Sequence, residues 1–196
     1  MSTIFNYSDL KDVVSKESSM LPGYKSRVSN VDVIIAKPSS VTKDLYDGMV
    51  VKLVNGKVEP LAASDKAEDV FGIIVSDTRA QRKGSSFGFG TAQFIEGYVR
   101  GTTVSVMQKG FIYVPVQDAI PTAGKQVYIR NAADSTNNRP IGGIESTSAT
   151  GNVALTGARF TGNYGYPLTS KQLGTTSEGG LTALTAEIAI DFSLRA

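Results

Sequence analysis

Residues 186–194 alternate strictly between apolar and mostly polar side chains, and this pattern constrains the fold more than any other feature of the chain. The apolar positions are Ala186, Ile188, Ile190, Phe192 and Leu194. A period of two residues is typical of a β-strand with one buried face. The segment therefore predicts a half-buried antiparallel strand, with Glu187 and Asp191 on its polar face.

A second strong signal is the dipeptide Asn55-Gly56, which lies between two short alternating segments. Both central residues of a type I′ turn need positive φ, and Asn-Gly meets that need best. A two-residue turn here pairs Leu53 with Val58 and Lys52 with Glu59. The apolar side chains then share one face, and the two charged residues meet as an opposite pair on the other.

Residues 104–106 and 112–116 also alternate, and they predict a second hairpin. A three-residue turn over Gln108-Lys109-Gly110 sets Val106 opposite Ile112 and keeps both apolar sets on one face. Its glycine then takes the left-handed position of a bulged turn.

Further short apolar segments at 71–75, 127–129 and 153–155 are separated by turn-rich stretches, and the chain has 20 glycines. No segment beyond residue 20 has the apolar spacing of a helix. Short strands at regular intervals predict an all-β domain, either a barrel or a sandwich.

Residues 1–40 differ from the rest, and we interpret them as an N-terminal arm preceding a β-rich body at 41–196. Residues 8–17 predict one short helix, with Ser8 as its N-cap and Leu10, Val13 and Val14 on one side. The alternative is an N-terminal segment packed on its own domain.

Composition excludes much of enzyme chemistry, because the chain contains no cysteine and no histidine. Thiol nucleophiles, disulfides, Ser-His-Asp triads and His- or Cys-ligated metals are therefore ruled out. The acidic stretch at 65–69 lacks the ligand spacing of a calcium loop. We expect no catalytic residue, no cofactor and no metal.

The net charge is +2 and the charges are well mixed along the chain. We therefore expect no nucleic-acid partner and no membrane partner. The first residues are polar and lack the features of a secretory signal, so we expect synthesis in a cytoplasm.

The glycine-rich segment 84–90 carries Phe87 and Phe89. The lysine of a phosphate-binding loop would follow the glycines and open a helix, which is not the pattern here. The two rings are candidates for a contact with a neighbouring subunit, and the alternative is a plain surface loop.

Residues 41–196 resemble the capsid cement, or head decoration, proteins of tailed bacteriophages. The segments that carry the resemblance are 47–53 with the Asn55-Gly56 hairpin, 70–75, 99–106, 124–128, 157–160 and the strand beginning at Ala186. These are structural motifs rather than catalytic signatures, and residues 1–40 match least.

The resemblance implies an antiparallel β-barrel or jelly-roll-like sandwich that binds the outside of a phage head across major capsid subunits. It also implies self-association, most often as a homotrimer and sometimes as a dimer, and assembly inside a bacterial host.

In that setting the arm would lie across neighbouring capsid subunits. Its candidate contact residues are Leu10, Val13, Val14, Met20 and Leu21. The competing interpretation is a tail-associated or fibre-type module that binds a receptor or a carbohydrate.

Overall fold

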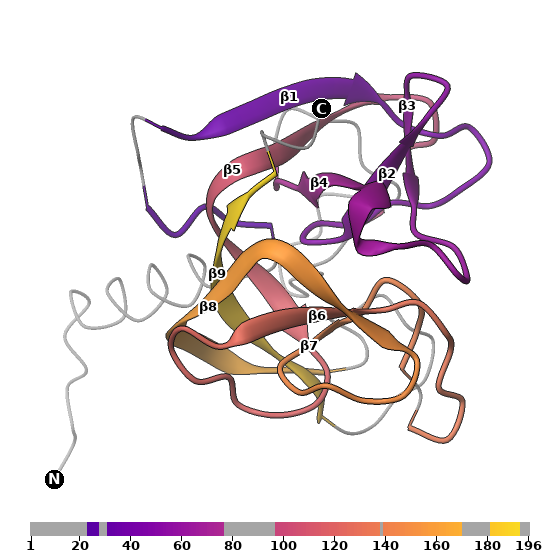
Figure 1. Cartoon of the computed structure of the whole chain (residues 1–196). Coiled ribbons are helices and arrows are strands. Elements are labelled where there is room, and N and C mark those ends of the chain that lie inside the picture. The colour runs from indigo at the N-terminus through magenta and orange to yellow at the C-terminus, as the bar shows by residue number, and fades with distance from the viewer. Residues whose placement is uncertain (1–22, 28–30, 77–96, 138, 170–180, 193–196) are drawn as a thin grey trace, which may run out of the picture.

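The computed structural model describes residues 23–27, 31–76, 97–137, 139–169 and 181–192 (Figure 1). Its strands are β1 (Val33–Pro38), β2 (Val50–Val54), β3 (Lys57–Pro60), β4 (Val70–Ile74), β5 (Thr103–Val116), β6 (Gln126–Arg130), β7 (Ile144–Glu145), β8 (Asn152–Thr169) and β9 (Leu181–Asp191). The only helical element in this described part is one 3-10 turn, η1 (Ala67–Asp69). The prediction of an all-β protein is confirmed.

Five of the strands close into a barrel. The sheet runs β5-β7-β6-β8-β9, and β9 pairs back onto the second half of β5. All of these pairings are antiparallel except the short contact between β5 and β7. The first half of β5 leaves the barrel and carries β1 on one side and β4, β2 and β3 on the other. The long strand β5 therefore joins the barrel to a second layer.

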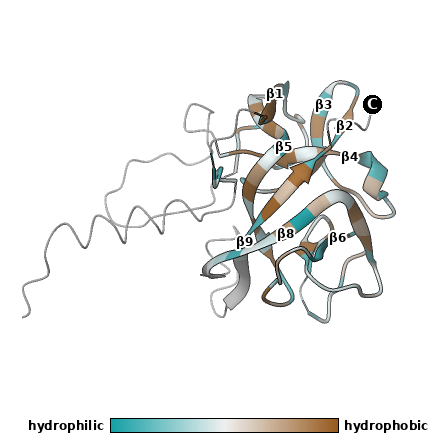
Figure 2. Cartoon of the chain, turned by 60° about the vertical axis from the view of Figure 1, so that its left-hand side comes forward, coloured by the Kyte–Doolittle hydropathy of each residue, from teal (hydrophilic) through white to brown (hydrophobic). Residues whose placement is uncertain are grey.

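Two apolar cores lie on opposite faces of this second layer. Ile73 on β4 and Met107 on β5 face the larger core, which fills the barrel. Ile74 and Val106, their chain neighbours, face a smaller core that also contains Tyr98. Hydrophobic positions recur along β4 and β5 in Figure 2 because both faces of these strands are covered.

The Asn55-Gly56 hairpin forms as predicted. The φ angles of these residues are 50° and 75°, and Lys52 pairs with Glu59 and Leu53 with Val58. The ion pair of Lys52 differs from the predicted one with Glu59, however. The ammonium of Lys52 lies 2.7 Å from a carboxylate oxygen of Asp65, while Glu59 accepts a hydrogen bond from Ser40.

The second predicted hairpin is wrong, because residues 103–116 form the single strand β5. Val106 faces the smaller core and Ile112 the larger one, so the two alternating segments serve different cores. Between them the pairing with β1 shifts by one residue, which is a β-bulge, and Gly110 has a φ of +136°. A bulged turn and a bulged strand both need such a glycine, and so the sequence pattern fits both.

At the N-terminal side, residues 33–38 form β1, which lies along β5 from Lys109 to Thr103. The predicted arm of residues 1–40 thus includes β1, which is paired with the body. The helix predicted for residues 8–17 lies outside the described residues, so an arm over residues 1–22 remains a prediction. At the other end, β9 buries Ala186, Ile188 and Ile190 as expected. Leu194 lies outside the described residues.

Candidate functional site

The residues predicted to make contacts all lie outside the described part of the chain. They are Leu10, Val13, Val14, Met20, Leu21, Phe87 and Phe89. The structure instead shows where the N-terminal segment joins the body, which is the attachment point of any arm formed by residues 1–22.

Residues 23–27 attach to β5 mainly through backbone hydrogen bonds. The Gly23 amide donates to the Tyr113 carbonyl (2.8 Å), and the Tyr113 amide donates to the Tyr24 carbonyl (3.0 Å). Ser76 adds a 2.8 Å hydrogen bond to the Gly23 carbonyl. Gly23 has a φ of +79°, and a Cβ there would come within 2.9 Å of Asp47 and two backbone nitrogens. Only glycine fits this position without movement of its neighbours.

A buried carboxylate fixes the end of this segment. Glu187, on the predicted solvent face of β9, is 1% exposed. Arg27 binds it with two hydrogen bonds, Nε to Oε1 at 3.0 Å and Nη2 to Oε2 at 2.9 Å. From β8, Asn163 donates to Oε2 at 2.7 Å and the Thr161 hydroxyl makes a further contact. We call these four residues the Glu187 clamp.

The Arg27 guanidinium crosses β5 to reach Glu187, and its carbon lies 4.6 Å from the centre of the Phe111 ring. Burial alone would raise the pKa of Glu187, but the hydrogen bonds from Arg27 and its neighbours outweigh burial and lower that pKa to about 2. Glu187 is therefore ionised at neutral pH, and the clamp holds the N-terminal segment, β5, β9 and β8 together.

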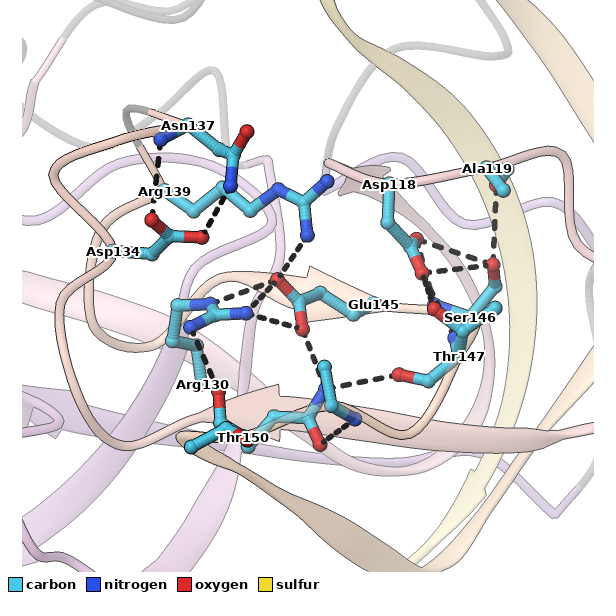
Figure 3. A network of polar contacts seen from close by, with 12 residues as sticks. Asp118, Ala119, Arg130, Asp134, Asn137, Arg139, Glu145, Ser146, Thr147 and Thr150 are labelled. Carbon is cyan, nitrogen blue, oxygen red and sulfur yellow. Dashed lines mark hydrogen bonds and ion pairs between the residues drawn. The ribbon is translucent and has the colours of Figure 1, made fainter.

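A second buried carboxylate lies on the barrel at the short strand β7 (Figure 3). Glu145 is fully buried, and Arg130 of β6 binds it with two hydrogen bonds of 2.8 and 3.0 Å. Asn152 donates to the same carboxylate at 2.5 Å and Arg139 lies 3.4 Å away. These four residues form the Glu145 clamp.

Asp118 binds the residues that directly follow β7, beside this clamp (Figure 3). It accepts hydrogen bonds from the backbone amides of Ser146 and Thr147, both at 2.8 Å, and from the Thr147 hydroxyl at 2.6 Å. Burial raises the pKa of Asp118, and these hydrogen bonds reverse the effect and lower it. The carboxylates of this region thus brace loops.

Sequence patterns missed both clamps. Glu187 belongs to an alternating polar face, which normally lies in water, and its partner Arg27 is 160 positions away. Arg130 and Glu145 directly follow the apolar residues Ile129 and Ile144, which places each at the end of an apolar segment. That position is the only local signal, and it does not identify a partner.

The described residues contain no group of three or more acidic side chains able to hold a metal ion. Within the same residues no helix is long and apolar enough to cross a membrane. Open grooves lie on the described part of the surface. An apolar groove of about 480 Å³ lies beside the Glu187 clamp and is lined by Val31, Phe111 and Ala189 among others. A more polar groove of about 380 Å³ includes Lys52, which pairs with Asp65.

Comparison with known proteins gives one family match. Residues 14–186 match the family described as structural cement protein (E217 gp24/Pam3 gp6). A solved structure titled "The capsid of Myoviridae Phage XM1" contains a chain that is similar in fold, with a TM-score of 0.51 and 21% identity. The match covers 88% of this chain and 91% of that one. The search of curated proteins found no match.

Proposed function

The chain belongs to the structural cement protein family of phages, and we propose that it binds the outer surface of a phage head across neighbouring major capsid subunits and stabilises the shell. The observation that carries the proposal is the family match over residues 14–186, which spans every strand up to the middle of β9. The protein accordingly belongs to the virion capsid. The similar fold of a chain from a phage capsid supports this conclusion.

The proposed contact elements are the arm and the loop at 84–90. In the arm, Leu10, Val13 and Val14 have the i, i+3, i+4 spacing of one helix face, and Met20 and Leu21 follow. Phe87 and Phe89 provide a second apolar contact. Each contact is weak alone, but several copies held in one oligomer raise the avidity by about 10²–10⁴-fold.

The Glu187 clamp gives the arm a firm attachment. A force applied to residues 1–22 is transmitted to Gly23 and Arg27. From there the backbone hydrogen bonds and the buried ion pair transmit it to the barrel strands β5, β9 and β8. A cement protein needs such a connection, because a contact on the shell stabilises it only if the body holds on to the contact.

The proposed partners are the major capsid protein and further copies of this chain. The family resemblance favours a homotrimer, with a dimer as the alternative. The proposed role is structural rather than enzymatic, in line with the description of the family as structural cement proteins. The hydrogen bonds around Glu145, Glu187 and Asp118 support this, because they occupy these carboxylates with structural donors.

The test uses phage heads that lack this protein, incubated with purified full-length chain or with a variant lacking residues 1–20. The truncation keeps Gly23 and the clamp. We expect the full chain to pellet with the heads in many copies and to protect them against heat, and the truncation to lose both effects.

Full-strength binding by the truncation would contradict the role of the arm. No binding by the full chain, or binding of a few copies at one vertex, would contradict the cement role and favour a tail component.

A further inference from the structure

Strand β1 forms an edge of the sheet. It pairs with β5 on one side, and in the described part of the chain no strand pairs with its other side. Figure 1 shows β1 along the outer margin of the molecule with β5 beneath it. An edge strand carries a row of backbone donors and acceptors that can pair with another chain.

The backbone groups that face away from β5 can be identified from the register. The Ser39 amide donates to the Thr102 carbonyl (2.7 Å), and the pairing is regular from Pro38 back to Ile34. Hydrogen-bonding direction alternates along a strand, so Ile35 and Lys37 also point to β5. The N–H and C=O groups of Ile34 and Ala36 therefore point outward.

The other edge of the sheet, β3, shows how this protein protects an edge. β3 carries Lys57 and Glu59 and ends in Pro60, and the Ser40 amide donates to its Val58 carbonyl. Charges, proline and a covering segment are the usual devices against edge pairing.

β1 lacks these devices over its first four residues. Residues 33–36 are Val-Ile-Ile-Ala, none of them is buried, and Ile34 is 40% exposed. Val31, just before the strand, is 57% exposed. The protective residues Lys37 and Pro38 come only at the end of β1. The open edge is thus short, uncharged and apolar.

We propose that β1 pairs antiparallel with β1 of a second copy of this chain, which rests on the dimeric alternative of the self-association proposed above and assigns its interface. Pairing about Ile35 sets Ile34 opposite Ala36 of the second copy, and Ala36 opposite its Ile34. These are the outward-facing residues, so all four outward N–H groups find carbonyl partners across the two-fold axis. Pro38 has no N–H, and it ends the ladder on both sides.

The second copy suits this edge better than an unrelated strand. The pairing is self-complementary, as a two-fold interface requires. It also uses up the edge of both copies, so the assembly closes as a dimer and does not grow. The Lys37 side chains lie opposite Val33 and about 13 Å from each other, given roughly 3.3 Å per residue, and therefore do not repel at contact distance.

A single cysteine tests the register, because the chain has none of its own. Ile35 would face Ile35 of the second copy in a non-hydrogen-bonded pair, where the Cα atoms lie about 4.5 Å apart. That spacing permits a disulfide. We expect Ile35→Cys to form covalent dimers under mild oxidation. The matched control is Leu53→Cys, at an exposed apolar position of another strand. Equal cross-linking of the two variants overturns the proposed register.

Solution mass over the micromolar range provides the second readout. We expect the native chain to be a dimer, Ile34→Lys to be a monomer, and Leu53→Lys to remain a dimer. Ile34 and Leu53 are matched in exposure, at 40% and 39%. A native monomer, a native trimer, or a dimer that survives Ile34→Lys overturns the proposal.

Binding of the same variants to phage heads separates this proposal from the cement role. A native chain that binds heads but does not pair through β1 contradicts only the interface. A dimer that splits with Ile34→Lys, but in its native form does not bind heads, contradicts only the cement role.

Discussion

The Glu145 and Glu187 clamps use the same chemistry for different purposes. In both, a buried carboxylate accepts two hydrogen bonds from an arginine and one from an asparagine. The Glu145 clamp joins residues 130–152 of one barrel region, and its arginine side chain is 3% exposed. The Glu187 clamp joins positions 160 residues apart, and its arginine side chain is 50% exposed.

We infer from this difference that the Glu145 clamp stabilises the barrel, whereas the Glu187 clamp attaches the N-terminal segment to it. We expect the barrel to depend on the Glu145 clamp, because β7 is only two residues long and lies between β5 and β6. The Glu187 clamp connects the barrel to a segment outside it, since Arg27 reaches across β5 to Glu187. Loss of the first should weaken the whole fold, and loss of the second should mainly release the N-terminal segment.

Removal of the Arg130 guanidinium should have the largest effect. Arg130→Met leaves Glu145 buried without its main partner, and we expect the free energy of unfolding to fall by about 3–5 kcal/mol. Urea unfolding followed by circular dichroism measures this change. The double variant Arg130→Met with Glu145→Leu removes both charges and should recover much of the loss. A single variant within about 1 kcal/mol of the native chain would show that the clamp is dispensable.

Neutralising Glu187 should have an intermediate effect. Glu187→Gln keeps the shape of the side chain but loses its charge, and we expect a loss of about 1.5–3 kcal/mol, the range for hydrogen bonds to a charged group.

Hydrogen exchange distinguishes the two clamps directly. In Glu187→Gln and in Arg27→Ala, the amides of Gly23 and Ser26 should exchange faster, while those of β6 and β7 should change little. Uniform acceleration across the barrel would mean that the Glu187 clamp also supports the fold.

Acid should weaken the Glu187 clamp in a defined range of pH. The pKa of Glu187 is lowered from its ordinary 4.5 to about 2. A lowered pKa stabilises the folded state above the unfolded value, and this contribution is lost as pH falls from about 4.5 to 2. The difference in stability between the native chain and Glu187→Gln should therefore shrink over that range. A difference that stays constant down to pH 2 would contradict the lowered pKa.

The smallest effect is expected at an exposed ion pair that joins β5 to β9. Lys109 and Asp191 lie 2.7 Å apart, but their side chains are 35% and 38% exposed. Lys109→Gln should change the free energy of unfolding by about 0–1 kcal/mol. A loss as large as that of Glu187→Gln would mean that burial does not distinguish these pairs.

Local signals in the sequence predicted the local parts of this fold. The Asn55-Gly56 turn fixed the register of its hairpin, because turn geometry and apolar pattern agree there. Alternation identified the buried face of β9. The hairpin predicted at residues 104–116 was wrong for two reasons. The backbone of Gly110 suits a turn and a bulge equally. In addition, the two faces of β5 pack into two different cores.

The long-range parts could not be predicted in this way. Burial of Glu187 depends on Arg27 and on β8, which are distant in sequence. Closure of the barrel depends on the pairing of β9 with β5, and nothing in either strand specifies the other. The predicted contact residues, such as Leu10 and Phe87, remain predictions.

Imaging of whole particles by electron cryomicroscopy is the direct test of whether this chain cements a phage shell. We expect density for the β-barrel over the entire outer surface of the head, at the seams between major capsid subunits. Density confined to the tail or to a single vertex, or none on the head, would contradict it.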